Sequence, residues 1–153
     1  MLRFALVGCG RIAVRHSELL GYKQVNGAIL VSVCDIAPEK SKRIGEKFNV
    51  PYYTSMDNMM SKEKIDVVVV LTPSGLHAQH VVNLAKYGKD IMVEKPMALT
   101  IEDVDAMIES CYENNCQLFV IKQNRFNVPV VKLREAYEQG RFGNLVLGTV
   151  RVR

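Results

Sequence analysis

Two glycines and a small residue follow the first apolar run of the chain. Gly8, Gly10 and Ala13 stand in the spacing G-x-G-x-x-A, directly after the apolar residues 4–7. In a dinucleotide site, the first glycine permits the turn out of a strand and the second lets the backbone approach a pyrophosphate. The helix that begins here directs free N–H groups toward phosphate, and its dipole favours the negative charge. The spacing therefore predicts a nucleotide site, with a plain tight turn as the alternative.

An acidic residue, Asp35, follows a second apolar stretch at residues 30–34. Its place after the strand is that of the acid that binds the adenosine ribose, although it lies somewhat further along than the usual ~20 residues. No arginine stands beside Asp35 to receive a 2′-phosphate, because Ile36, Ala37 and Pro38 come next. We therefore expect NAD rather than NADP as the cofactor. The alternative is that Asp35 only caps a helix.

Lys95 lies between Glu94 and Pro96 at the end of a further predicted strand. Proline restricts the residue before it to extended backbone, which fixes the direction of Lys95. Neighbours in an extended chain point to opposite sides, so Glu94 and Lys95 do not share a face. A lysine at a strand end beside a nicotinamide can bind the hydroxyl or carbonyl that exchanges hydride, and can pass a proton. The alternative is a surface ion pair before a turn.

Helical and extended patterns alternate along almost the whole chain. Residues 67–71 form a continuous apolar run, which is typical of a parallel strand buried on both faces. Capping patterns place helix starts at Ser55, Ser74 and Thr100, the last with Asp103 in a capping box. The alternation predicts an α/β fold with a doubly wound parallel sheet of the Rossmann type. Strands are predicted at residues 3–7, 30–34, 51–53, 66–71, 90–93, 118–121 and 145–153, and helices at 11–24, 38–48, 55–60, 75–87, 100–114 and 128–139.

The segments that follow the predicted strands are expected to meet in one cleft. In doubly wound sheets, ligands bind at the carboxyl ends of the strands, near the point where the strand order reverses. His77, in the first turn of its helix, is expected to line this site or to cap the helix rather than to catalyse. The segments that should converge are residues 8–12, Asp35, 72–74, 94–96 and 123–125.

The composition is that of a globular domain and argues against several other classes of protein. The chain has 153 residues, 48% of them hydrophobic, and a net charge of +4. The basic residues are scattered and the apolar runs are short, so neither nucleic acid nor a membrane is implied as a partner. The first predicted strand begins at residue 3, which leaves no room for a signal peptide and indicates a cytoplasmic protein. No metal site is expected, because the cysteines lack ligand spacing and resemble buried fillers: Cys9, Cys34, Cys111 and Cys116.

The motifs at residues 7–13, 71–77 and 94–96 occur in a single order and spacing. Together they resemble the N-terminal half of the Gfo/Idh/MocA family, the relatives of glucose–fructose oxidoreductase and inositol dehydrogenase. The resemblance implies an NAD(P)-dependent oxidoreductase with Lys95 as the catalytic residue. The implied cofactor contacts are Gly8, Gly10, Arg11 and Ile12 along the pyrophosphate, Asp35 at the ribose, and Thr72, Pro73 and His77 toward the nicotinamide, with Ser74, Glu94, Lys95 and Gln123 also in contact.

Residues 123–126, with 140–145 after them, most resemble members that oxidise nucleotide sugars in surface-polysaccharide pathways. This implies a sugar or nucleotide-sugar substrate, contacted by Lys95 and Arg125. Family members continue into an α+β domain that holds the substrate and supplies a histidine beside the lysine. Residues 1–121 would then be the dinucleotide-binding domain, and 122–153 a connecting helix and the first strand of that second domain, here truncated. We expect a homo-oligomer at full length and no dehydrogenase activity from these residues alone.

Two other interpretations remain open at this point. The family includes a transcriptional inhibitor that keeps the fold without turnover, so the main alternative is a non-catalytic NAD-sensing module. Lys95 favours the enzyme, whereas the shortness of the chain favours the sensor. The third interpretation is an isolated structural domain whose glycine motif binds no nucleotide.

Overall fold

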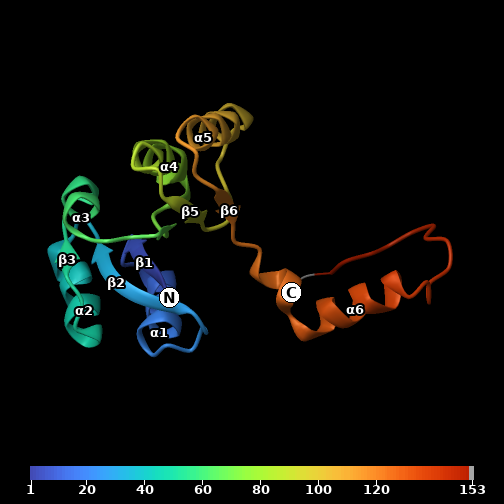
Figure 1. Ribbon diagram of the computed structural model, residues 1–153. Helices are drawn as coiled ribbons and strands as arrows, with labels where there is room; N and C mark the ends of the chain where they lie inside the picture. The colour runs from blue at the N-terminus through green and yellow to red at the C-terminus, as the bar shows by residue number, and fades with distance from the viewer. Residues whose placement is uncertain (152–153) are drawn as a thin grey trace. The chain divides into compact units, whose positions relative to one another are not determined.

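A computed structural model describes residues 1–151, which divide into a first unit, Met1–Ile121, and a second unit that begins at Lys122. The first unit holds a six-stranded parallel sheet in the order β3-β2-β1-β4-β5-β6 (Figure 1). The chain runs outward from β1 to β3, crosses to β4 on the other side of β1, and continues to β6. The prediction of a doubly wound Rossmann sheet is therefore confirmed. The strands are β1 (Leu2–Val7), β2 (Ala28–Cys34), β3 (Tyr52–Tyr53), β4 (Val67–Val70), β5 (Asp90–Val93) and β6 (Leu118–Val120).

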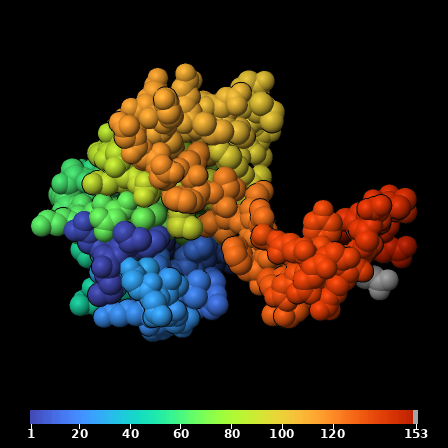
Figure 2. Space-filling model, turned by 45° about the vertical axis from the view of Figure 1, so that its right-hand side comes forward, coloured from blue at the N-terminus to red at the C-terminus, as the bar shows by residue number. Residues whose placement is uncertain are grey.

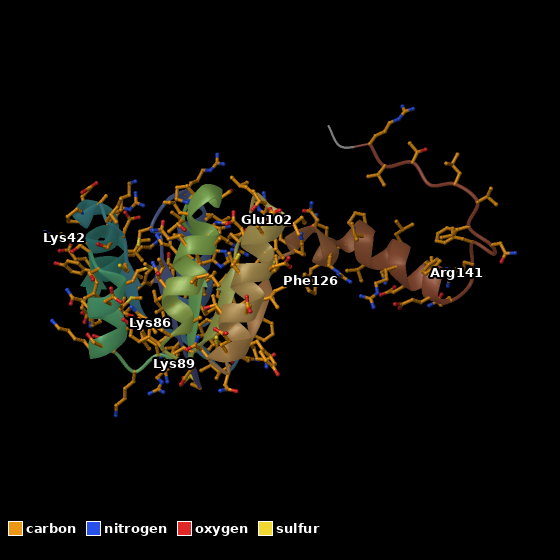
Figure 3. The ribbon with its side chains drawn as sticks, turned by 90° about the horizontal axis from the view of Figure 1, so that it is seen from above. Lys42, Lys86, Lys89, Glu102, Phe126 and Arg141 are labelled. Atoms are coloured by element: carbon orange, nitrogen blue, oxygen red, sulfur yellow. The ribbon has the colours of Figure 1, made fainter. Side chains whose placement is uncertain are left out.

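Helices cover both faces of the sheet, with α1 and α2 on one face and α3, α4 and α5 on the other (Figure 1). They are α1 (Arg11–Gly21), α2 (Pro38–Phe48), α3 (Met56–Lys62), α4 (His77–Ala85) and α5 (Ile101–Glu113). α4 and α5 pack against each other, and their surfaces meet in Figure 2. Lys42 on α2 points away from the sheet (Figure 3) and forms an ion pair with Glu46. No helix in residues 1–151 is long and apolar enough to cross a lipid bilayer.

The core consists of two apolar layers, because side chains of a strand alternate between its faces. On β1, Ala5 and Val7 pack toward α3, α4 and α5, whereas Leu6 packs toward α1 and α2. β4 alternates in the same way, and all four of its valines are buried. The prediction of a strand buried on both faces is thereby confirmed, and it explains the continuous β-branched sequence. The four cysteines are free and buried, as expected of core fillers.

Side-chain caps begin two helices where the sequence predicts them. The Ser55 hydroxyl accepts a hydrogen bond from the amide of Asn58 at 3.3 Å. The Thr100 hydroxyl accepts one from the amide of Asp103 at 3.1 Å. Each cap satisfies an N–H group that has no partner within its helix and is worth about 1 kcal/mol of stability. The two caps fix the first turns of α3 and α5.

The prediction that Ser74 caps the helix after β4 is wrong. Ser74 begins a 3-10 turn, η1 (Ser74–Leu76), and α4 follows at His77 without a side-chain cap. The amide of Leu76 donates to the carbonyl oxygen of Pro73 at 2.8 Å, so Ser74 already lies inside a turn. A residue inside a turn cannot act as its cap, which is why the sequence pattern misplaced the helix start.

The second unit, taken by itself, contains a 3-10 turn and a helix. These are η2 (Gln123–Phe126) and α6 (Val128–Glu138), close to the helix predicted at 128–139. No residue of α6 is buried. The strand predicted at 145–153 is wrong over 145–151, which form no strand, and residues 152–153 lie outside the described part of the chain. A strand needs a neighbour to pair its backbone N–H and C=O groups, and the described residues of this unit offer none.

Candidate functional site

The glycine turn between β1 and α1 is packed against the backbone of two neighbouring segments. Gly8 has a φ of +95°, a conformation that glycine adopts freely and other residues rarely do. A Cβ atom at Gly8 would lie 2.8 Å from the carbonyl carbon and oxygen of Leu71 and from the nitrogen of Thr72. The Gly8 amide donates to the carbonyl oxygen of Cys34 at 2.8 Å. Only glycine therefore fits between the ends of β2 and β4.

The other two small residues of the G-x-G-x-x-A motif have opposite surroundings, one open and one buried. Gly10 precedes the first turn of α1 without a side-chain cap, and no heavy atom lies within 4 Å of where its Cβ would stand. Ala13 is fully buried in the core. The first N–H groups of α1 are thus left for a ligand, and the approach to them past Gly10 is open. This geometry suits an anionic group such as a pyrophosphate.

A groove of about 790 Å³ lies within the first unit, at the carboxyl ends of β1, β2 and β4. The strand order reverses between β1 and β4, which is where ligands bind in sheets of this class. Ser74, His77, Glu94 and Lys95 do not line the groove. The predicted cofactor residues that do line it are Gly8, Gly10, Arg11, Ile12, Asp35, Thr72 and Pro73.

The Asp35 carboxylate connects the glycine turn to the start of α2. Its oxygens accept hydrogen bonds from the amide of Cys9 at 2.7 Å and from that of Ala37 at 2.9 Å. Each carboxylate oxygen keeps a further lone pair, and the half-buried side chain lines the groove. Asp35 therefore joins the glycine turn to the residue before α2 and also presents acceptors to a ligand. The capping alternative is wrong, because the N-cap of α2 is Ala37 and no side chain caps this helix.

Two thiols lie beside this turn. Burial, and then the charge of Asp35, raises the pKa of Cys9 to about 12 and that of Cys34 to about 11. Both thiols therefore stay protonated near neutral pH, and neither acts as a nucleophile there. Within residues 1–151, no group of three or more His, Cys, Asp and Glu side chains is arranged to hold a metal ion.

Sequence reasoning missed much of the groove wall. Thr54 and Ser55 follow the short strand β3, so the rule that ligands meet strand ends could have found them. Lys40 is an exposed residue of α2, and nothing in the sequence shows that it borders a groove. The further lining residues that the sequence did not single out are Ile36, Met56, Asp57, Leu76 and His80.

His80 is half-buried on α4 and contacts the β4 exit. Its Nδ1 lies 2.9 Å from the hydroxyl oxygen of Thr72. Burial, and then the neighbouring His77, lowers the pKa of His80. The ring is therefore neutral near pH 7 and acts as a hydrogen-bonding partner that orients the Thr72 hydroxyl at the groove wall.

His77 lies behind the groove rather than on it. Its side chain is only 1% exposed, although the sequence suggested a lining residue. Nε2 lies 2.8 Å from the carbonyl oxygen of Thr72, and Nδ1 lies 2.8 Å from that of Pro96. The ring turns inward because both nitrogens face backbone oxygens. His77 therefore bridges the chain leaving β4 and the chain leaving β5.

Glu94 and Lys95 have very different surroundings. Glu94 is 8% exposed, with one carboxylate oxygen 3.0 Å from His16 Nε2 and the other accepting from the Lys95 amide at 3.1 Å. Lys95 is exposed at the carboxyl end of β5, before a cis bond to Pro96. Within the described residues the acid pairs with His16, and Lys95 joins no ion pair. The Lys95 ammonium group is therefore available to a ligand.

Two other predicted site residues lie in the second unit. Gln123 and Arg125 are exposed members of η2. The contact of Gln123 with the cofactor and that of Arg125 with the substrate stay predictions.

Residues 2–122 match the Gfo/Idh/MocA profile, which describes an oxidoreductase family with an NAD-binding Rossmann fold. The chain belongs to this family. The match spans the whole sheet and the glycine turn, so the resemblance drawn from the three motifs is confirmed. The part of the family that this match represents is the NAD-binding domain.

Proteins whose names indicate different substrates resemble this chain. The WlbA dehydrogenase of Bordetella pertussis, solved with NADH and UDP-GlcNAcA, is 38% identical with a TM-score of 0.86, over 93% of this chain and 43% of that one. The myo-inositol 2-dehydrogenase of Thermotoga maritima is 32% identical over 93% of this chain and 42% of that protein. The 2,7-anhydro-N-acetylneuraminate hydratase of Mediterraneibacter gnavus is 33% identical over 72% and 29%. The chain thus spans less than half the length of these relatives.

Proposed function

We propose that this chain is the cofactor-binding half of an NAD-dependent dehydrogenase that oxidises a hydroxyl of a sugar or nucleotide sugar. The observation that carries the proposal is the groove lined by Gly8, Gly10 and Asp35 in a chain of this oxidoreductase family. The nucleotide-sugar class is supported by the likeness to WlbA, which is solved with NADH and UDP-GlcNAcA.

The glycine turn and Asp35 would hold the two ends of the adenosine diphosphate part. The open approach at Gly10 and the free N–H groups of α1 suit the pyrophosphate. Asp35 would accept hydrogen bonds from the ribose hydroxyls and repel a 2′-phosphate, which favours NAD over NADP. Thr72 and Pro73 border the groove on the side that leads toward β5.

Lys95 is the proposed catalytic residue. Oxidation of a hydroxyl removes a hydride from its carbon and a proton from its oxygen, and bound NAD⁺ supplies the hydride acceptor. Lys95 extends from the carboxyl end of β5, next to the β4 exit that walls the groove, and its ammonium group is engaged in no ion pair of the described chain. Its Nζ would hold the substrate oxygen and take part in moving the proton there.

Cofactor titrations of the chain itself test the nucleotide site. We expect tighter binding of NADH than of NADPH, measured by calorimetry. Asp35→Ala should weaken NADH binding by about tenfold or more and erode the preference, because two charge-assisted hydrogen bonds are lost. Asp57→Ala is the matched control, since Asp57 lines the same groove but pairs with Lys86. Equal or tighter binding of NADPH to the unaltered chain would contradict the assignment.

Turnover distinguishes the dehydrogenase from the NAD-sensing alternative. With NAD⁺ and a UDP-sugar, we expect no reduction of NAD⁺ by the 153-residue chain, because hydride transfer requires a substrate held at close range and the dehydrogenases it resembles are more than twice as long. A polypeptide that carries the chain together with a substrate domain should reduce NAD⁺. If that longer polypeptide binds NADH tightly and turns over no sugar, the sensing function is favoured instead.

A further inference from the structure

The chain leaving β5 is held from two sides by histidines of two different helices. His16 from α1 reaches Glu94, and His77 from α4 reaches the carbonyl oxygen of Pro96. We propose that these two histidines are positioning residues that fix the backbone from which the Lys95 side chain extends. The importance of this support for catalysis rests on the proposed function of Lys95. Whether the histidines hold the backbone in place can be measured without any reaction.

The contact from α1 acts through the Glu94 carboxylate. His16 and Glu94 have side chains only 20% and 10% exposed, and His16 Nε2 lies 3.0 Å from Oε1. The other oxygen, Oε2, accepts the hydrogen bond of the Lys95 amide at 3.1 Å. With both oxygens engaged, the carboxylate cannot rotate without breaking a contact. His16 therefore sets the orientation of the group that holds the Lys95 backbone.

The contact from α4 acts on the backbone directly. The His77 ring lies 2.8 Å from the carbonyl oxygen of Pro96 and 2.8 Å from that of Thr72. Either neutral tautomer donates to one of these oxygens, and both contacts are hydrogen bonds when both nitrogens carry hydrogen. Since Thr72 borders the groove, the ring ties the segment that carries Lys95 to the wall of the nucleotide site.

The exposure of Lys95 explains why such support matters. Its side chain is exposed, so its placement depends on the backbone at its base. A displacement of about 1 Å can lower a reaction rate about 10²-fold, because reacting groups must meet in a narrow range of geometries. The buried polar groups of Glu94 and His77 satisfy their hydrogen-bonding needs largely on residues 72, 95 and 96. The polar contacts are thus concentrated around the one exposed lysine at this strand end.

Amide exchange of the labelled 153-residue chain, followed by NMR, tests the His16 contact. The Lys95 amide should be protected although its side chain is exposed. His16→Ala should speed its exchange by about tenfold or more relative to amides of β4, because the carboxylate loses its anchor. His16→Gln supplies an amide donor toward Glu94 and should restore protection. Glu46→Gln, which breaks an exposed ion pair with Lys42, is the matched control and should change nothing at Lys95.

Two results would overturn the proposal. One is unchanged Lys95 exchange in His16→Ala. The other is an equal rise at all amides, which would show a general loss of stability rather than a local release. His77 is fully buried, so its replacement can unfold the domain. The His16 variants decide the contact from α1. For the contact from α4, His77→Gln with protected β4 amides should speed exchange at Lys95, and unchanged exchange there would overturn the role of His77.

Kinetics of a polypeptide that also carries a substrate domain separates this inference from the proposed function. His16→Ala should lower kcat by about tenfold while KM for NAD stays nearly constant, and His16→Gln should recover most of the loss. If Lys95→Ala leaves turnover normal, the proposed function fails while the exchange result stands. If Lys95→Ala abolishes turnover and His16→Ala does not alter kcat, the positioning role is overturned and the proposed function stands.

Discussion

β5 and residues 145–151 share an extended, apolar-rich pattern but differ in structure. In β5, Ile91 and Val93 are fully buried, and the strand pairs with β4 and β6. In the second unit, Val146 and Val150 are 95% and 88% exposed, and the stretch forms no strand. An alternating sequence becomes a strand only where neighbours complete its hydrogen bonds and cover one face.

Unlike the predicted strand at residues 145–151, the helix α6 of the second unit does form. Several of its apolar side chains, Leu133 and Tyr137 among them, are exposed, yet the helix forms where the sequence predicts it. A helix closes its hydrogen bonds within its own segment, so it depends less on neighbours than a strand does. The two units differ for this reason, since the first unit buries its strands and the second keeps only its local structure.

In the proposed function the chemistry belongs to the first unit, and replacing Lys95 should therefore have the largest effect on activity. In a polypeptide that carries this chain with a substrate domain, Lys95→Ala should reduce turnover by about 10²–10⁴-fold, the range for a positioned acid or base. NAD affinity should change far less. The control variant is Lys89→Ala, because Lys89 is an exposed lysine directly before the start of β5 (Figure 3). Normal turnover in Lys95→Ala would show that the lysine is misassigned.

The two glycines of the turn should separate stability from binding. Gly8→Ala forces a Cβ to 2.8 Å from the backbone at Leu71 with φ at +95°, so the free energy of unfolding should fall by about 1–3 kcal/mol. Gly10→Ala adds its Cβ to open space, so stability should change by less than about 0.5 kcal/mol while NADH binding weakens. Urea unfolding and NADH titration measure the two effects. Equal stability of both variants would contradict the geometry of the turn.

The ion pair between Arg3 and Asp66 should make the stability of the first unit depend on acid pH. Hydrogen bonds from the side chain and backbone of Arg3 hold the pKa of Asp66 well below its ordinary range. A carboxyl whose pKa is lower folded than unfolded stabilises the fold above about pH 4 and loses that contribution as pH falls further. Unfolding measured against pH should therefore be steeper below about pH 4 in the unaltered chain than in Asp66→Asn. Identical curves would rule out the contribution.

Removing the second unit should have the smallest effect. A chain ending at Ile121 keeps the whole sheet, both core layers and every residue that lines the groove. Its unfolding midpoint should match that of the 153-residue chain, and its NADH affinity should fall by no more than the one predicted contact at Gln123 contributes, about 1 kcal/mol. A larger loss of NADH affinity would place more of the cofactor site beyond residue 121.

The sequence alone determined the features that depend on neighbouring residues. Gly8 and Gly10 mark the turn because backbone freedom is a property of the residue itself. The order of strands and helices follows from the periodicity of apolar residues. The rule that ligands bind at the carboxyl ends of strands correctly predicted that Asp35 lines the same groove as the two glycines. The three motifs at residues 7–13, 71–77 and 94–96 were together enough to recognise the family.

Tertiary structure decided the features that depend on residues far apart in the chain. His16 and Glu94 are 78 positions apart, and no local pattern predicts that they pair. His77 turns inward, because carbonyl oxygens of two separate segments lie on either side of its ring. The strand expected at residues 145–151 is absent from the structure, although the alternation on which it rested is real. Periodicity reports which faces could be buried, whereas a strand, a pocket or an ion pair also requires that another segment arrives there.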